Sequence, residues 1–153
     1  MLNAKRELVS NRKMETSDQI DLFEQALNEI FAKRDFNDFE SLINGFDDKT
    51  ENEEVMFSLI HALEYFAENK GGEVYINKIL SCLKLLNPHA LDWAELLMLR
   101  IINDDTYYDL LRKIVAENYS YDTDILKLIL KKLIKRNPDR FSEKCNYLFS
   151  FIK

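Results

Sequence analysis

The stretch ALDWAELLMLRII, residues 90–102, decides the fold, because almost every position in it is apolar. Apolar residues on all sides of a helix leave it no face for solvent, so other elements have to cover it. We therefore expect a central helix over 90–102, with further helices packed around it.

The composition also favours helices. The 153 residues include only 3 Gly and 2 Pro, too few for the tight turns of a many-stranded sandwich or barrel. Apolar residues make up 46% and charged residues 31%, which fits neither a disordered chain nor a membrane-spanning one. A chain of this length has the size of one ordinary domain. We expect a single helical domain over 1–153, in which residues 1–16 form a frayed N-terminal segment.

Hydrophobic periodicity predicts the other elements outward from the central helix. Before it, helices are expected at about 18–33, 36–43, 51–68 and 74–86, and after it at about 104–117, 121–137 and 139–152. Thr50 and Glu53 have the spacing of a capping box, which would begin the third of these helices. The pattern predicts an all-α fold of seven to eight antiparallel helices in an irregular, HEAT-like helical-repeat array.

The net charge is −6 and the pI is near 5.0, which disfavours general nucleic-acid binding because phosphates attract the opposite sign. The segment ILKLILKKLIKR, residues 125–136, carries lysines on an apolar helix, as a membrane-surface or RNA-binding helix does. Its apolar residues also have the spacing of a core-facing stripe, with lysines on the wet side. We favour the packed helix and expect neither a nucleic-acid nor a membrane partner.

Motifs of the common phosphate-binding, hydrolase and zinc-protease sites are absent from the sequence. Cys82 and Cys145 stand alone and are interpreted as buried, reduced thiols, which fits a cytoplasmic protein. His61 and Glu64 have the only metal-like spacing, and a di-iron bundle needs a much larger ligand set. We expect no enzymatic activity, no metal and no cofactor. A helical enzyme or metal carrier built around His61 and Glu64 is the alternative.

Acidic residues are concentrated between residues 35 and 54, where eight of them face the single base Lys49. Five lie in a turn that feeds a helix N-terminus, and the helix dipole explains two or three of these. The others, joined by two more at a later turn, would form a negative ridge that attracts a cationic partner. The predicted partner-binding residues are Asp47, Asp48, Glu51, Glu53, Glu54, Asp104 and Asp105, with a merely solvated surface as the alternative.

Two segments, EEVMFSLIHALEYF (53–66) and LDWAELLMLRIINDDTYYDLL (91–111), carry a resemblance to a known family. Together they resemble the immunity protein 30 family of bacterial polymorphic-toxin and contact-dependent growth inhibition systems. The matching positions are Glu54, Val55, Met56, Leu59, Ile60, His61 and Glu64 in the first segment, and Trp93, Ala94, Leu97, Arg100, Ile101 and Asn103 in the second.

The resemblance implies a small cytoplasmic antidote that binds the C-terminal domain of a cognate toxin and blocks it without catalysis. Many such toxins are nucleases with basic clefts, which an acidic protein can occupy in place of a phosphate backbone. His61, Glu64, Trp93 and Arg100 are then the structural or semi-exposed polar residues of the motif, with Arg100 pairing with Glu64 across adjacent helices.

A different function class stays open from the residues alone. A helical-repeat adaptor would bind a host peptide or protein in a concave groove, with exposed aromatic side chains as anchors. Its candidate anchors are Tyr107, Tyr108, Tyr119 and Tyr121.

Overall fold

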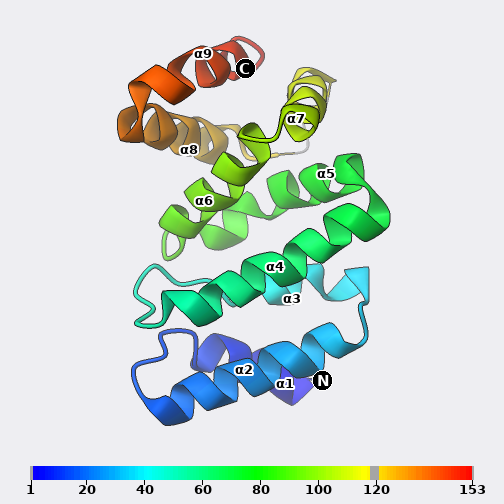
Figure 1. Cartoon of the computed structure of the whole chain (residues 1–153), viewed down its shortest axis with the longest axis vertical. Coiled ribbons are helices and arrows are strands. Elements are labelled where there is room, and N and C mark those ends of the chain that lie inside the picture. The colour runs from blue at the N-terminus through cyan, green and yellow to red at the C-terminus, as the bar shows by residue number, and fades with distance from the viewer. Residues whose placement is uncertain (1, 118–120, 153) are drawn as a thin grey trace.

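The computed structural model describes residues 2–117 and 121–152, which form a stack of helices along the long axis of the molecule (Figure 1). Within these ranges there are nine α-helices, two short 3-10 turns and no strand. Their bounds are α1 Leu2–Ser10, α2 Ser17–Ala32, η1 Phe36–Asp38, α3 Phe39–Ile43, α4 Glu53–Lys70, α5 Gly72–Cys82, η2 Leu83–Leu86, α6 Leu91–Ile102, α7 Asp105–Glu117, α8 Thr123–Arg136 and α9 Pro138–Phe149. The all-α prediction is confirmed, with slightly more helices than expected.

The additional helix is α1, which lies in the segment expected to be frayed. Leu8 is fully buried and Ala4 is 3% exposed, so one side of α1 is part of the core. Lys5 also forms an ion pair with Asp38 at 3.2 Å. The segment expected to be frayed, residues 1–16, thus contains a regular helix that packs against α2.

Consecutive helices pack in pairs that build the stack. α1 lies on α2, α4 on α5 and α8 on α9, whereas α6 contacts both α7 and α8. Figure 1 shows the chain rising from α1 and α2 at one end to α8 and α9 at the other, with α6 between α4 and α8. The likeness of this stack to HEAT repeats stays a prediction.

The central helix is confirmed by α6, which runs over Leu91–Ile102. Its core side is buried through Trp93, Ala94, Leu97, Met98, Ile101 and Ile102. A narrow strip remains half-buried, with Leu96 and Leu99 on it. Leu96 and Leu99 line a groove on this side of the helix.

The start of α4 differs from the capping-box prediction. The side chain of Asn52 accepts a hydrogen bond from the Val55 N–H at 3.0 Å and is the N-cap. The Thr50 hydroxyl accepts instead from the Asn52 N–H at 3.3 Å. Asn is among the strongest N-cap residues, so α4 begins at Glu53.

The lysine-rich segment is a packed helix, as predicted. Ile125, Ile129 and Leu133 of α8 are buried in the core. Among the described residues, no helix is both long and apolar enough to cross a membrane.

The Phe66 side chain generates a test of the core. Its ring lies 5.4–6.1 Å from the rings of Phe31, Phe36, Phe39 and Tyr65. Phe66→Ala should lower the free energy of unfolding by about 3–5 kcal/mol because it leaves a cavity. Val74→Ala, at a side chain that is 43% exposed, is the control and should change it little. Equal stability of the two variants in urea denaturation would contradict this packing.

Candidate functional site

Residues 46–52, which we call the acidic loop, are anchored by an ion pair between the buried Asp47 and the partly exposed Arg12. Asp47 is 3% exposed, and its carboxylate accepts hydrogen bonds from Arg12 Nε at 3.1 Å and from the Lys49 N–H at 2.9 Å. The same guanidinium donates to the Asn44 carbonyl at 3.1 Å. A buried carboxylate needs such partners. Asp47, predicted as a partner contact, is therefore a structural residue.

The acidic loop is also bonded to the start of α6. The indole N–H of Trp93 donates to the Asp47 carbonyl at 3.0 Å, and the Asp48 N–H donates to the His89 carbonyl at 2.8 Å. The Asp48 carboxylate accepts from the N–H groups of Asp92 and Trp93 at 3.1 and 3.3 Å. The first N–H groups of a helix have no partner within it, so Asp48 caps α6 from a distant part of the chain.

This position changes the proton affinity of Asp48. Burial disfavours its charged form and raises the pKa of the carboxyl, and the nearby charge of Asp92 acts in the same direction. The hydrogen bonds from the N–H groups of Asp92 and Trp93 oppose this effect. Asp48 is only partly accessible, and its oxygens are already occupied by α6.

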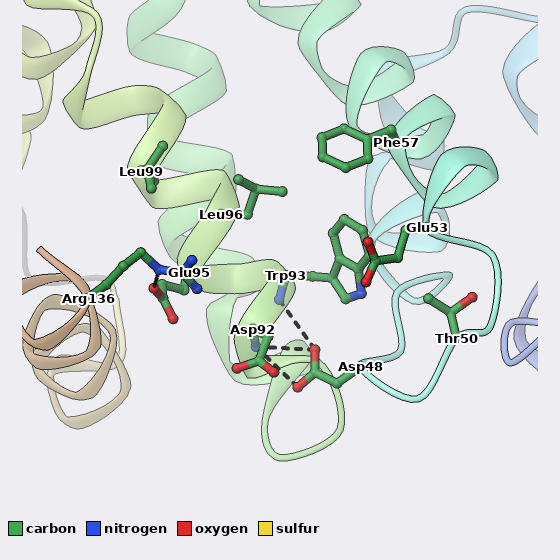
Figure 2. Close-up of a pocket in the computed structure, with 10 residues that line it drawn as sticks. All are labelled: Asp48, Thr50, Glu53, Phe57, Asp92, Trp93, Glu95, Leu96, Leu99 and Arg136. Carbon is green, nitrogen blue, oxygen red and sulfur yellow. Dashed lines mark hydrogen bonds and ion pairs between the residues drawn. The ribbon is translucent and has the colours of Figure 1, made fainter.

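A groove of about 230 Å³ opens between α4 and α6, directly beside the acidic loop (Figure 2). We call it the α4–α6 groove. Its apolar lining consists of Phe57, Trp93, Leu96 and Leu99. Its polar lining consists of Asp48, Thr50, Glu53, Asp92, Glu95 and Arg136. Figure 2 shows Glu53 and Phe57 on one wall, Leu96 and Leu99 on the facing wall, and Trp93 between them.

The charges on one side of the groove are largely compensated by α8. The side chain of Glu95 is 4% exposed, and it accepts a hydrogen bond from Arg136 and lies 3.9 Å from Lys132 Nζ. Lys132 also pairs with Asp92 at 3.0 Å, although 66% of the Asp92 side chain is exposed. Lys132 therefore serves two carboxylates, and Asp92 keeps access to solvent.

The carboxylates on the α4 side are free. Glu51, Glu53 and Glu54 are exposed, and none of them forms an ion pair or a side-chain hydrogen bond with a residue of 2–117 or 121–152. Glu53 and Glu54 lie in the first turn of α4, where the helix dipole favours negative charge. Of the five carboxylates predicted around this loop, these three face solvent.

Asp104 and Asp105 lie elsewhere. Asp104 caps α7 by accepting from the Tyr107 N–H at 3.0 Å, and Asp105 lies 3.6 Å from Lys144 Nζ. They follow the C-terminal end of α6, about 18 Å from its start at a rise of 1.5 Å per residue. The structure therefore separates them from the acidic loop. Instead of the single negative ridge expected from the sequence, there are two separate acidic patches.

The predicted pairing of Arg100 with Glu64 is confirmed. Arg100 Nε and Nη2 donate to the two carboxylate oxygens at 2.8 and 2.7 Å, joining α6 to α4. This hydrogen bonding raises the pKa of Arg100. His61 is exposed on α4, and Trp93 is 7% exposed.

Both cysteines are buried, and the residues of the His61–Glu64 alternative do not form part of a metal-ligand cluster in the ranges 2–117 and 121–152. Within the described residues, no three His, Cys, Asp or Glu side chains are grouped to hold a metal ion. Glu64, one of the two residues of the alternative metal site, accepts hydrogen bonds from Arg100. Burial raises the pKa of the Cys145 thiol to about 11 and also raises the pKa of Cys82, so both thiols stay protonated at neutral pH.

The tyrosine anchors of the adaptor alternative are not a set of exposed side chains. Tyr108 and Tyr121 are buried, and their hydroxyls donate to the carbonyls of Lys144 at 3.0 Å and Val115 at 2.9 Å. Tyr107 is half-buried, and Tyr119 lies outside the described residues. The expectation of exposed anchors is therefore wrong for Tyr108 and Tyr121, because their rings complete the core.

The sequence pattern does not predict most of the groove. Asp92 and Glu95 lie in a helix that is apolar nearly throughout, and Arg136 lies among the lysines of α8. The available signal was the i, i+3 spacing of Asp92 and Glu95, which places two carboxylates on one side of α6.

The cap of α6 gives a test of the acidic loop. Asp48→Ala removes the acceptor for two N–H groups and should lower the free energy of unfolding by about 1 kcal/mol. Asp48→Asn keeps an acceptor and should lose less. Because the folded protein raises the pKa of Asp48, its ionised form costs stability above that pKa, and the amide avoids this cost. Glu51→Ala is the control. Equal losses for Asp48→Ala and Asp48→Asn at pH 7 would contradict the capping role.

The residues that form the acidic loop and most of the groove lie within a match to a known protein family. The family model described as immunity protein 30 matches residues 10–111, which is well over half of the chain. The match includes the acidic loop, α4 and α6, and ends before α8. No curated protein and no solved structure matches the chain. The chain belongs to the immunity protein 30 family.

Proposed function

We propose that this chain is an immunity protein that binds and neutralises the C-terminal domain of a cognate bacterial toxin, in a polymorphic-toxin or contact-dependent growth inhibition system. Family membership supports the immunity role. One observation supports the location: free carboxylates at the start of α4 lie beside a groove with an apolar lining. The protein acts in the cytoplasm by binding alone.

The charge of the protein favours a nuclease as the toxin. A nuclease binds its substrate with Lys and Arg side chains, because the negative phosphates attract positive charge. A partner with net charge −6 and exposed carboxylates is attracted to such a cleft, which raises the rate of association. The free carboxylates would then occupy positions that phosphates take in the substrate complex.

In the proposed binding surface, the predicted residues have different roles. Asp47 and Asp48 position the acidic loop and stay within the protein. Glu51, Glu53 and Glu54 supply the exposed charge, and Asp92 extends it across the groove. Asp104 and Asp105 form a second patch at the other end of α6.

Binding by this surface leads to a growth-rescue prediction. Cells that express the toxin domain encoded immediately upstream should survive when they also express this chain. A Glu51→Lys, Glu53→Lys, Glu54→Lys variant should lose most of this protection, because three attractive contacts become repulsive. Colony counts under induction of both proteins measure the effect.

The control is a variant with the same change in charge on another surface. Asp21→Lys, Glu24→Lys and Glu143→Lys replace exposed carboxylates of α2 and α9 and should keep full protection. Circular dichroism melting of both triple variants verifies that they fold. Equal protection by the two folded variants would remove Glu51, Glu53 and Glu54 from the binding surface. Absence of rescue by the unmodified chain would remove the immunity role itself.

A further inference from the structure

The α4–α6 groove has the size and chemistry of a receptacle for one side chain. Its volume of about 230 Å³ is below the range of about 300–1,000 Å³ that is usual for small-molecule pockets. Phe57 and Trp93 meet edge to face with ring centroids 5.6 Å apart, and Leu96 and Leu99 lie opposite Phe57. The groove therefore offers apolar contact to a guest about as long as a side chain.

Carboxylates stand on both sides of this apolar lining. Glu53 projects from α4 without an ion-pair partner among the described residues, and Asp92 projects from α6 with most of its side chain in solvent. Glu95 is compensated by Arg136, and Asp48 by the N–H groups of α6. Asp92 pairs with Lys132 at 3.0 Å, but 66% of its side chain is exposed. The negative charge that can face a guest is therefore carried by Glu53 on one wall and by the accessible part of the Asp92 carboxylate on the other.

An apolar groove flanked by carboxylates suits a long cationic side chain. A long cationic side chain buries its methylene stem on apolar surface and keeps its charged end among polar groups. Arginine suits the site better than lysine, because its planar guanidinium stacks on aromatic rings and donates hydrogen bonds in several directions. Arginine is also enriched among the few residues that carry most of the energy of an interface.

We propose that the α4–α6 groove receives one arginine side chain of the cognate toxin domain as the anchor of the complex. Its stem lies against Phe57, Leu96 and Leu99, and its guanidinium lies between Glu53 and Asp92. This inference rests on the proposed function, and it adds the identity of the anchoring residue and the site that takes it.

A double-mutant cycle tests the anchor. The probe is the domain encoded immediately upstream, catalytically inactivated, and its binding is measured by titration calorimetry. Glu53→Gln with Asp92→Asn should raise the Kd by about tenfold or more. One surface Arg→Ala variant of the toxin domain should do the same, and the combined loss should be much smaller than the product of the two. Glu117→Gln with Glu143→Gln is the isosteric control on exposed carboxylates away from the groove, and it should leave the Kd unchanged.

The outcomes separate this inference from the proposed function. The arginine anchor is wrong if the loss of binding free energy from every toxin Arg→Ala variant adds fully to the loss from Glu53→Gln with Asp92→Asn. It is also wrong if the Glu53→Gln, Asp92→Asn variant binds the toxin domain as tightly as the control variant does. The immunity role stands in both cases. Analytical ultracentrifugation tests a second possibility. If this chain dimerises and Glu53→Gln with Asp92→Asn abolishes the dimer, the groove binds a second copy of the chain and the arginine anchor is wrong. Failure of the unmodified chain to bind the inactivated domain would instead remove the proposed function.

Discussion

The attachment of residues 47 and 48 to two distant parts of the chain fixes the shape of the candidate site. Asp47 is bonded to Arg12 and through its carbonyl to Trp93, and Asp48 caps α6. The bonds of Asp47 are buried or partly buried, and breaking one would leave a polar group or a charge without a partner, at a cost well above that of an exposed contact. The start of α4 and the start of α6 are thereby held side by side, with the groove between them.

Within this frame, neighbouring carboxylates have different tasks. Asp47 and Asp48 neutralise internal donors, whereas Glu51, Glu53 and Glu54 remain free to meet another protein. An exposed surface charge contributes little to stability, so these glutamates can serve binding at almost no cost to the fold. On α6, Glu95 and Asp92 are both paired with α8, but Glu95 is buried and Asp92 stays accessible.

Periodicity was sufficient to predict the helices because each buries one continuous apolar side, as α6 and α8 do. α1 is harder to predict, because a short helix with two buried apolar residues gives almost no periodic signal. The acidic loop was located from composition, but the roles of its members depend on partners far away in sequence. Asp47 is buried because Arg12 reaches it, and the groove exists because α4, α6 and α8 converge. Neither contact can be predicted from the pattern of residues along the sequence.

The most direct measurement of the central claim, that the toxin domain docks on the α4–α6 groove, is amide hydrogen exchange of this chain with and without the inactivated toxin domain. Docking on the groove should add protection in residues 49–57 and 91–99 and leave α1 and α9 unchanged. Protection confined to α1, α2 or α9, with none along the groove, would contradict it.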